Sequence, residues 1–475
     1  ALGALTSGAG NVAVGYQAGT SLVEGQQNTV LGYEAFDAGE EDSRCVAIGY
    51  QALTQADVSN TGSAVTTANT AVGYSAGYRT TTGKENTMIG YAAYGSATGV
   101  RNTAIGVNVL AEADGSETDN IAIGYSALGD LNDDSAAQNI AIGNYAADGM
   151  GTVGAHLNNI FIGYSTGGGT WENNPSTSNT AIGNCAMDDA MDACTDNVAV
   201  GFATLSGLTT GDENVAIGMQ SGNDVTTGSS NTVVGAFAGD ALTTSSSNVA
   251  IGKNSLGAAT TSADYNIAIG ESAMSGAWST ADVNNCVSIG YNSMAGVLTT
   301  DATGSIAIGQ GTLNALTSGI GNIAIGYQAL NVSVDSDYST AVGHQALKAQ
   351  TGTAGTVANT AVGYNAGLAV TTGIQNTFLG YNAGVALTKG GQNTAIGYQT
   401  LAAEDVGDKS TAIGTYALYS QNSDSDNEDT GNTGLGYGSG FYNVTGQNNT
   451  YLGYNAGFGA SGQSNSGNTG VGKDT

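Results

Sequence analysis

A short pattern of small, branched and polar residues recurs along the whole chain. The segments NVAVGYQAG (11–19), NIAIGYQAL (322–330) and NTAIGYQTL (393–401) all carry it. We call this pattern the phrase. It occurs 26 times, and twelve of the 25 spacings between successive copies are 17 residues. A recurring period of this length is the signature of a repeat architecture, in which each unit buries its apolar side only by stacking on its neighbours.

Each position of the phrase has its own chemistry. Position 1 is Asn in 21 copies, position 3 is Ala in 17, position 4 is always Ile, Val or Leu, and position 5 is always Gly. Position 2 is mostly Thr, Val or Ile, so positions 2 to 4 predict a short β-strand. Position 6 is Tyr in 14 copies but also Lys253, Glu271 and His344, which predicts a surface position. The constant Gly predicts a bend, a positive φ or a close backbone approach.

The second half of the repeat unit predicts another short strand followed by a turn. LTTGDEN (208–214) and VTTGIQN (370–376) each place a β-prone stretch before a Gly turn. No sustained apolar period of 3.6 residues is present, which disfavours helices. We therefore expect an all-β fold, a parallel β-roll or β-helix solenoid of about 26 coils with two short strands per coil. It would form one continuous domain over residues 1–475.

Strand alternation puts positions 2 and 4 of the phrase on one face and position 3 on the other, with position 5. We expect the larger residue of position 4 to fill the inside of each coil. Stacking would also place each first-position Asn on the next, so that the side-chain amides form a hydrogen-bonded ladder. The predicted core is represented by Ile48, Ile123, Ile217, Ile251, Ile325 and Ile396.

The opposite face would then present a long uncharged strip of Ala and Gly. Small residues let backbones approach closely, so we expect this strip to pack against other copies of the chain around a symmetry axis. The predicted interface between copies is represented by Ala47, Gly49, Ala122, Gly124, Ala250, Gly252, Ala324 and Gly326.

Composition and charge exclude several kinds of partner. The chain has nine Lys and Arg against 39 Asp and Glu, a formal net charge of −30. Nucleic acids and anionic membranes are bound through basic residues, so neither is an expected partner. No apolar stretch is long enough for a membrane helix, so no membrane insertion is expected. The chain opens with ALGALTSGAGN and stops at NTGVGKDT, both inside the repeat, so we expect a segment of a longer fibrous protein.

The phrase resembles the repeats of a known family. NTAIGYQTL, NVAIGKNSL (248–256) and CVAIGYQAL (45–53) are similar to the head repeats of YadA-like trimeric autotransporter adhesins, whose core phrase is close to SVAIG. The resemblance implies a left-handed parallel β-roll that assembles as a homotrimer. Very similar phrases, with Tyr after Gly and a TTG turn, occur in phage tail fibres.

The longer coil, the frequent first-position Asn and the sixth-position Tyr favour the phage fibres. We therefore expect an extracellular structural fibre on a virion surface, a rigid homotrimeric rod for host attachment. Its partner would be a host-surface receptor, either a glycan or a protein. The alternative is a trimeric adhesin of the bacterial cell surface, which binds matrix or other cells.

Catalytic motifs are absent from the sequence, so no enzyme activity is expected. The two histidines, His156 and His344, lie far apart, and no Ser/His/Asp set has a strand–elbow–helix context. GLGYGSG (434–440) resembles a nucleotide-binding loop only as a string, because it lacks the βαβ setting and its glycines belong to the repeat.

Cysteines and acidic insertions are the remaining candidates. A disulfide between Cys185 and Cys194 would close the loop CAMDDAMDAC in an oxidising compartment, whereas two free thiols are the alternative. No other cofactor than Ca²⁺ is suggested. Its candidate ligands are carboxylates of the segment SQNSDSDNEDTG (420–431), although EF-hand spacing is not met and a solvated loop explains the same residues. These candidate ligands are Asp424, Asp426, Glu428 and Asp429.

Overall fold

The computed structural model describes most of the chain, in two compact units that are treated separately below. The units comprise Ala1–Ala236 and Phe237–Thr475. Both are built of strands and turns, and the described residues contain no helix. The described residues are 1–58, 64–113, 115–132, 134–151, 154–171, 174–258, 263–276, 283–299, 302–352, 355–423, 425–426, 428–461 and 464–475.

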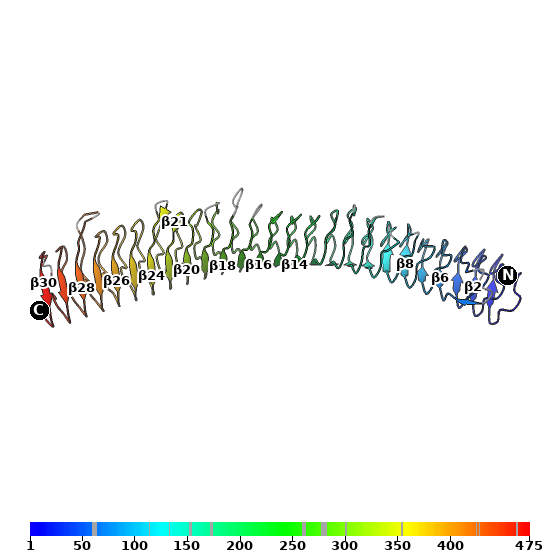
Figure 1. The fold of residues 1–475 in the computed structure, drawn as a ribbon, viewed down its shortest axis with the longest axis horizontal. Coiled ribbons are helices and arrows are strands. Elements are labelled where there is room, and N and C mark those ends of the chain that lie inside the picture. The colour runs from blue at the N-terminus through cyan, green and yellow to red at the C-terminus, as the bar shows by residue number, and fades with distance from the viewer. Residues whose placement is uncertain are drawn as a thin grey trace. The chain divides into compact units, whose positions relative to one another are not determined.

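Each phrase contributes one short strand, made of positions 2 to 4, to a parallel ladder. In Figure 1 the arrows of each unit lie side by side in a row, with the connecting turns beyond them. The ladder strands of the first unit are β1 (Val12–Val14), β2 (Thr29–Leu31), β4 (Val46–Ile48), β6 (Thr70–Val72), β7 (Thr87–Ile89), β8 (Thr103–Val107), β9 (Ile121–Tyr125), β10 (Ile140–Ile142), β11 (Ile160–Ile162), β12 (Thr180–Ile182), β13 (Val198–Val200), β14 (Val215–Ile217) and β15 (Thr232–Val234).

The second unit repeats the arrangement, so each unit is a parallel β-solenoid. The prediction of an all-β parallel solenoid is thereby confirmed, whereas its continuity over the whole chain stays a prediction. The ladder strands here are β16 (Val249–Ile251), β17 (Ile267–Ile269), β18 (Val287–Ile289), β19 (Ile306–Ile308), β20 (Ile323–Ile325), β22 (Thr340–Val342), β24 (Thr360–Val362), β25 (Thr377–Leu379), β26 (Thr394–Ile396), β27 (Thr411–Ile413), β28 (Thr433–Leu435), β29 (Thr450–Leu452) and β30 (Thr469–Val471).

Insertions between phrases do not disturb the ladder. The two longest spacings follow β4 and β27, yet Val46 still pairs with Thr70 and Thr411 with Thr433, parallel and in register. The ladder therefore continues across both connections, because register is set by the repeated strand and not by the length of the connection.

The prediction of two strands per coil is only partly right. In the second half of the coil, short pairs form between β3 (Asp42–Ser43) and β5 (Val65–Thr66), and between β21 (Ser336–Asp337) and β23 (Gly355–Thr356). Elsewhere in the described residues the second strand is reduced to isolated bridges such as Lys84–Val100. The turn glycines and side-chain hydrogen bonds of this half replace a regular ladder.

The orientation of the strand is the reverse of the prediction. Position 3 points into the coil, and positions 2 and 4 point out of it, in almost every strand. The alanines assigned to an interface between copies (Ala47, Ala122, Ala250 and Ala324) are fully buried within their own chain. The isoleucines assigned to the core (Ile48, Ile123, Ile217, Ile251, Ile325 and Ile396) are half-buried or exposed on its outer side.

A narrow interior explains this reversal. The space between the two halves of a coil is already occupied by a large residue at position 9 of the phrase, such as Leu205, Leu330 or Leu401. Position 3 is therefore restricted to a small residue, Ala or in one copy Ser288, wherever position 9 is large in the coils that flank it. Closely packed interiors do not admit extra methylene groups without strain.

The exceptions at position 3 support this account. Met88 and Phe161 are fully buried, and each lies against a position-9 glycine. A Cβ on Gly77 would be 2.7 Å from Sδ of Met88, and one on Gly167 would be 2.6 Å from Cδ1 of Phe161. The other bulky residues of this position, Phe378 and Tyr451, overlap position-9 glycines in the same way. Each glycine thus leaves the volume that the larger ring or chain fills.

The constant glycine of position 5 lies where successive coils approach most closely. In all 26 copies its φ is between 124° and 148°, a region that L-residues with a Cβ avoid. A Cβ on Gly49 would be 2.7 Å from the carbonyl carbon of Gly73, and one on Gly252 would be 2.6 Å from that of Gly270. The predicted positive φ and close approach are confirmed. For Gly49, Gly124, Gly252 and Gly326, the crowding comes from the next coil of the same chain.

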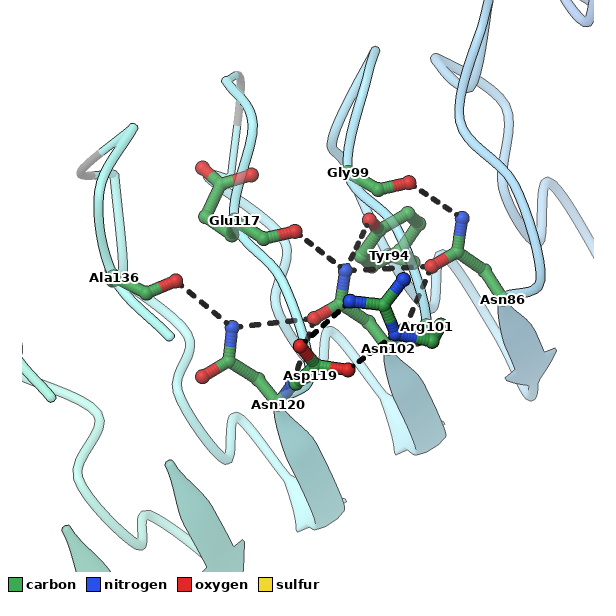
Figure 2. Close-up of polar contacts among 9 residues, drawn as sticks. All are labelled: Asn86, Tyr94, Gly99, Arg101, Asn102, Glu117, Asp119, Asn120 and Ala136. Carbon is green, nitrogen blue, oxygen red and sulfur yellow. Dashed lines mark hydrogen bonds and ion pairs between the residues drawn. The ribbon is translucent and has the colours of Figure 1, made fainter. Parts of the chain in front are cut away.

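The first-position asparagines form the predicted ladder and also clamp each coil to itself (Figure 2). The backbone N–H of Asn102 donates to Oδ1 of Asn86 at 2.8 Å, and that of Asn120 donates to Oδ1 of Asn102 at 2.9 Å. Nδ2 of Asn86 donates to the carbonyl of Gly99, and Nδ2 of Asn102 to that of Glu117, both at 2.8 Å. One buried amide therefore satisfies backbone groups of two coils.

Where Ser replaces the ladder Asn, a glutamine eleven residues later can fill the gap. Nε2 of Gln350 donates to Oγ of Ser339 at 3.0 Å, and Oε1 of Gln350 accepts from Nδ2 of Asn359 at 2.9 Å. Gln421 donates in the same way to Ser410 at 2.8 Å. Both glutamines are buried at a level of the coil that holds Leu in repeats such as the one with Leu208. The ladder is thus continued by a side chain from the other half of the coil.

Exchanging the residues at positions 3 and 9 of one coil tests the packing rule, by which position 3 is bulky only beside a glycine at position 9. Gly384→Leu alone should overpack against Phe378 and cost about 1–3 kcal/mol, and Phe378→Ala alone should leave a cavity and cost about 3–5 kcal/mol. The double variant restores the Ala and Leu pairing seen at Ala324 and Leu330, where Leu330 has a φ of 48° close to the 57° of Gly384. Most of the loss should be recovered, with a coupling of about 2 kcal/mol.

Amide hydrogen exchange in β24 to β26 measures this locally, since distant coils of a repeat array need not unfold together. Losses in the double variant that equal the sum of the two single losses would contradict the packing rule.

Candidate functional surface

The side of each solenoid unit formed by positions 2 and 4 of the phrase is apolar and open to solvent in the single chain. We call it the outer strand face. Ile217 is 41 % exposed and Leu379 is 46 % exposed, and the residues at position 2 are mostly Thr, Val and Ile. No charged residue occupies position 2 or 4 in any copy of the phrase. Contiguous apolar surfaces of this extent mark interaction sites in soluble proteins.

Aromatic side chains of position 6 form columns beside this face. In the first unit, successive rings stack nearly parallel with centroids 5.0–5.4 Å apart. In the second unit His344 continues a column between Tyr327 and Tyr364, at 5.1 and 5.0 Å. The exposed rings confirm that position 6 is at the surface. The first column consists of Tyr16, Tyr33, Tyr50, Tyr74 and Tyr91.

A second kind of aromatic column occurs near the end of the second unit, at position 10 of the phrase. Tyr419 stacks on Phe441 at 5.0 Å, and Phe441 stacks on Phe458 at 5.1 Å. This column lies near the stacked position-6 pair Tyr437 and Tyr454, whose centroids are 5.2 Å apart. Three successive coils thus present aromatic rings at position 10.

A hollow of about 540 Å³ opens between these two columns. Position 7 of the phrase is Gly438 in the coil that contributes Phe441, and a Cβ there would lie 2.7 Å from Oδ1 of Asn455 and 3.4 Å from the Phe458 ring. Tyr416 meets both columns edge-on, with centroids 6.0 Å from Tyr437 and 6.0 Å from Phe441. The amides of Gln399 and Asn455 complete the lining. We call this feature the aromatic hollow.

Another hollow, of about 350 Å³, lies in the first unit and has a different chemistry. Tyr78 and Tyr94 contribute rings, but Arg79 and Glu112 also line it, so opposite charges face the same space. Burial raises the pKa of Tyr94, whose hydroxyl accepts from Nδ2 of Asn102 at 2.8 Å. That phenol belongs to the asparagine ladder shown in Figure 2.

The predicted calcium ligands are not brought together among the described residues. Asp426 and Asp429 pair with Lys389 and Lys409, each at 2.6 Å, and Glu428 accepts from Nε2 of Gln447. Asp424 lies outside the described residues. Within the part of the chain that the structure describes, no group of three or more His, Cys, Asp or Glu side chains could hold a metal ion.

The proposed disulfide is not formed, since Cys185 and Cys194 are both free thiols. Cys185 lies at position 7 on the outer side of its coil and is only half-buried. Cys194 is buried in the following turn, where its thiol donates to the carbonyl of Thr209 at 3.0 Å. Burial raises the pKa of Cys194 to about 12, which keeps the thiol protonated and unreactive.

A buried carboxylate in the second unit is fully satisfied by the protein. Oε1 of Glu404 accepts from the backbone N–H groups of Gly407 at 2.7 Å and of Val406 and Ser423 at 3.2 Å. Its Oε2 accepts from Nε2 of Gln421 at 2.8 Å and from the Ser423 hydroxyl at 3.1 Å. Five donors around one carboxylate indicate a structural role in the turn and leave little capacity for a ligand.

Asp42, in the first unit, is a less well satisfied buried carboxylate. Its side chain is 1 % exposed. Oδ2 accepts from the N–H of Val58 at 3.3 Å, and no described group hydrogen-bonds to Oδ1. Burial raises the pKa of Asp42 to about 6, although a hydrogen bond from Thr67 opposes the shift. The neighbouring Cys45 thiol lies 3.1 Å from the Thr67 hydroxyl, and burial raises its pKa to about 11.

Comparisons with known proteins do not assign this surface. Scans against protein-family models, curated proteins and solved structures found no match. Among the described residues, no helix is long and apolar enough to cross a membrane.

Two features of this surface escaped the sequence reasoning. Bulky residues at position 3 coincide with glycines at position 9. This coincidence indicates that position 3 points into the coil, and therefore that positions 2 and 4 point outward. The aromatic hollow could have been found from Gly at position 7 beside aromatic residues at positions 6 and 10.

Replacement of the buried carboxylate should stabilise the first unit above pH 6. The folded state binds the Asp42 proton with a pKa of about 6, against 3.8 for an ordinary aspartate. Between these values the folded state holds more protons, so this group's contribution to stability rises as the pH falls from about 7 to about 4. Asp42→Asn removes the charge and keeps an acceptor for Val58. At pH 7.5 it should stabilise the fold by on the order of 3 kcal/mol, with little difference near pH 4.

Thermal unfolding measured between pH 4 and 7.5 by circular dichroism gives the comparison. A variant that is less stable than the wild type at pH 7.5 would show that the ionised carboxylate is needed where it lies.

Proposed function

We propose that the chain forms the rod of a host-attachment fibre, in which three copies meet through their outer strand faces. The observation that carries this proposal is the outer strand face itself. Its Ile, Val, Leu and Thr side chains recur at every coil and stay open to solvent in one chain, although hydrophobic burial favours covering them. The resemblance of the phrase to YadA-like head repeats and phage-fibre repeats supports a left-handed roll and a threefold assembly.

Threefold symmetry suits a face of this kind. Around one axis, each level would bring the same position-2 and position-4 residues of three chains together, so every contact would repeat from coil to coil. Branched side chains of moderate size would interdigitate there, much as they do between packed sheets. This reverses the interface predicted from the alanines, since the alanines are the core of the single chain.

The rest of the surface would remain available for a receptor. The aromatic columns and the turns lie outside positions 2 and 4, and the acidic composition disfavours polyanions. A neutral glycan or a protein on the host surface is therefore the partner that we propose. The rod would act outside the cell, on the surface of a virion.

Charge placed on the outer strand face tests the assembly. The wild type should have a mass in solution about three times 46.9 kDa. Ile182→Glu with Ile217→Glu would bury two carboxylates per chain in the interface, which should cost more than about 3 kcal/mol per copy. The temperature at which the trimer dissociates should fall accordingly, as measured by light scattering during heating.

The matched control is Thr210→Glu with Thr227→Glu, which adds the same charge at exposed turn positions of neighbouring coils. All four positions are solvent-exposed in the single chain, so a protein that works as a monomer would tolerate both pairs equally. A monomeric wild type, or equal behaviour of the two pairs, would contradict the trimer.

Attachment is tested with the fluorescently labelled rod on a panel of whole bacterial cells. Binding to a subset of strains, displaced by unlabelled rod, is the expected result. A folded trimer that binds no strain, or all strains without competition, would oppose the attachment role.

A further inference from the structure

The aromatic hollow combines features that do not occur together elsewhere in the described phrases. It has two aromatic walls, the stacked position-6 rings of Tyr437 and Tyr454 and the stacked position-10 rings of Phe441 and Phe458. Phe441 and Phe458 are half-buried, so each ring keeps an open part facing the space. The lining thus offers flat apolar surface about two coils long.

One glycine lets two lining residues of the hollow lie where they do. Position 7 carries a side chain in nearly every other coil, as Asn365 and Asn382 do at φ of 52° and 54°. Gly438 has a φ of 60° and no side chain, and a Cβ there would lie 2.7 Å from Oδ1 of Asn455 and 3.4 Å from the Phe458 ring, two residues that line the hollow. Gly311 is the other glycine at this position, but its coil has Gln310 at position 6 and Asn314 at position 10. The hollow therefore depends on Gly438 in an aromatic setting.

The polar groups of the hollow are all neutral. Gln399 and Asn455 provide amides, and Tyr416 and Tyr437 provide phenols, so donors and acceptors are mixed. No carboxylate, Lys or Arg lines the space. Flat aromatic surface with a few neutral hydrogen-bonding groups suits a ligand that has an apolar face and several hydroxyl groups.

We infer that the aromatic hollow binds one or two rings of a neutral saccharide. The apolar C–H face of a pyranose would pack on the aromatic walls, and its hydroxyl groups would exchange hydrogen bonds with the amides and phenols. The volume of about 540 Å³ is in the range of small-molecule sites. This inference rests on the proposed function and deepens it, because it gives the class of receptor that the fibre recognises.

Charge favours a neutral sugar over the two other ligands that aromatic walls attract. An acidic sugar would meet a chain of net charge −30 with no basic residue in the hollow. A quaternary ammonium group gains most from an aromatic cage, but such a cage would leave the amides and phenols of this hollow without partners.

The test is binding of the full chain to an array of neutral and sialylated oligosaccharides, followed by titration calorimetry with the best neutral ligand and with choline. We expect binding to neutral sugars and none to choline. Gly438→Asn introduces a residue that neighbouring coils hold at the same backbone conformation, but it should displace the Asn455 amide and crowd the Phe458 ring, so affinity should fall at least tenfold. Phe458→Ala, which removes part of one wall, should also weaken binding by about tenfold.

Gly311→Asn is the matched control, since it makes the same change at the same phrase position in a coil that has no aromatic residue at position 6 or 10, and its affinity should equal that of the wild type. Binding of choline or of sialylated sugars alone, undiminished binding by Gly438→Asn, or no sugar bound by the folded wild type would overturn the inference. If sugar binding fails while the labelled rod still attaches to cells, only the hollow is wrong. If neither occurs with an intact trimer, the proposed function fails as well.

Discussion

The narrow width of each coil is the constraint on which the rest of this structure depends. Successive coils are tied by strand pairing and by the asparagine ladder, and the space inside that positions 3 and 9 share is limited. Position 9 usually takes that space, so position 3 must be small; where position 3 is Met, Phe or Tyr, a nearby position 9 is Gly. The branched residues of positions 2 and 4 are consequently displaced outward. The apolar outer strand face is therefore a result of how thin the coil is.

Much of the architecture could be predicted from the sequence because repetition makes it independent of detail. Strand positions, parallel register, the positive φ of the position-5 glycine and the exposure of position 6 all follow from comparing copies within one chain. The inward face could not be predicted by the same means. Alternation alone does not say which face of a strand points into the coil. The rule that the larger residue points inward assumes a wide core, and Ala47 and Ile48 contradict that assumption. The aromatic hollow could not be predicted by comparing copies, because residues from several successive coils line it together.

The same geometry suits the proposed function in attachment. A solenoid with one apolar side can cover that side only by association, which gives a stiff assembly, and it leaves the turns and position-10 residues free to vary. In these coils position 10 carries Tyr419, Phe441 and Phe458, and position 7 carries Gly438 in one of them. The ladder strands of the same coils keep their register. In the proposed fibre, recognition could thus change from coil to coil while the ladder stays the same.

The central claim, that the outer strand face is covered in the assembled protein, is tested most directly by hydroxyl-radical footprinting of the unmodified wild type. Leu379 is 46 % exposed in the single chain, and Ile374, in the turn of the preceding repeat, is 37 % exposed. The account predicts that Ile374 is oxidised at the rate of an open aliphatic residue while Leu379 is protected like a buried one. Oxidation of Leu379 at a rate equal to or above that of Ile374 would contradict it.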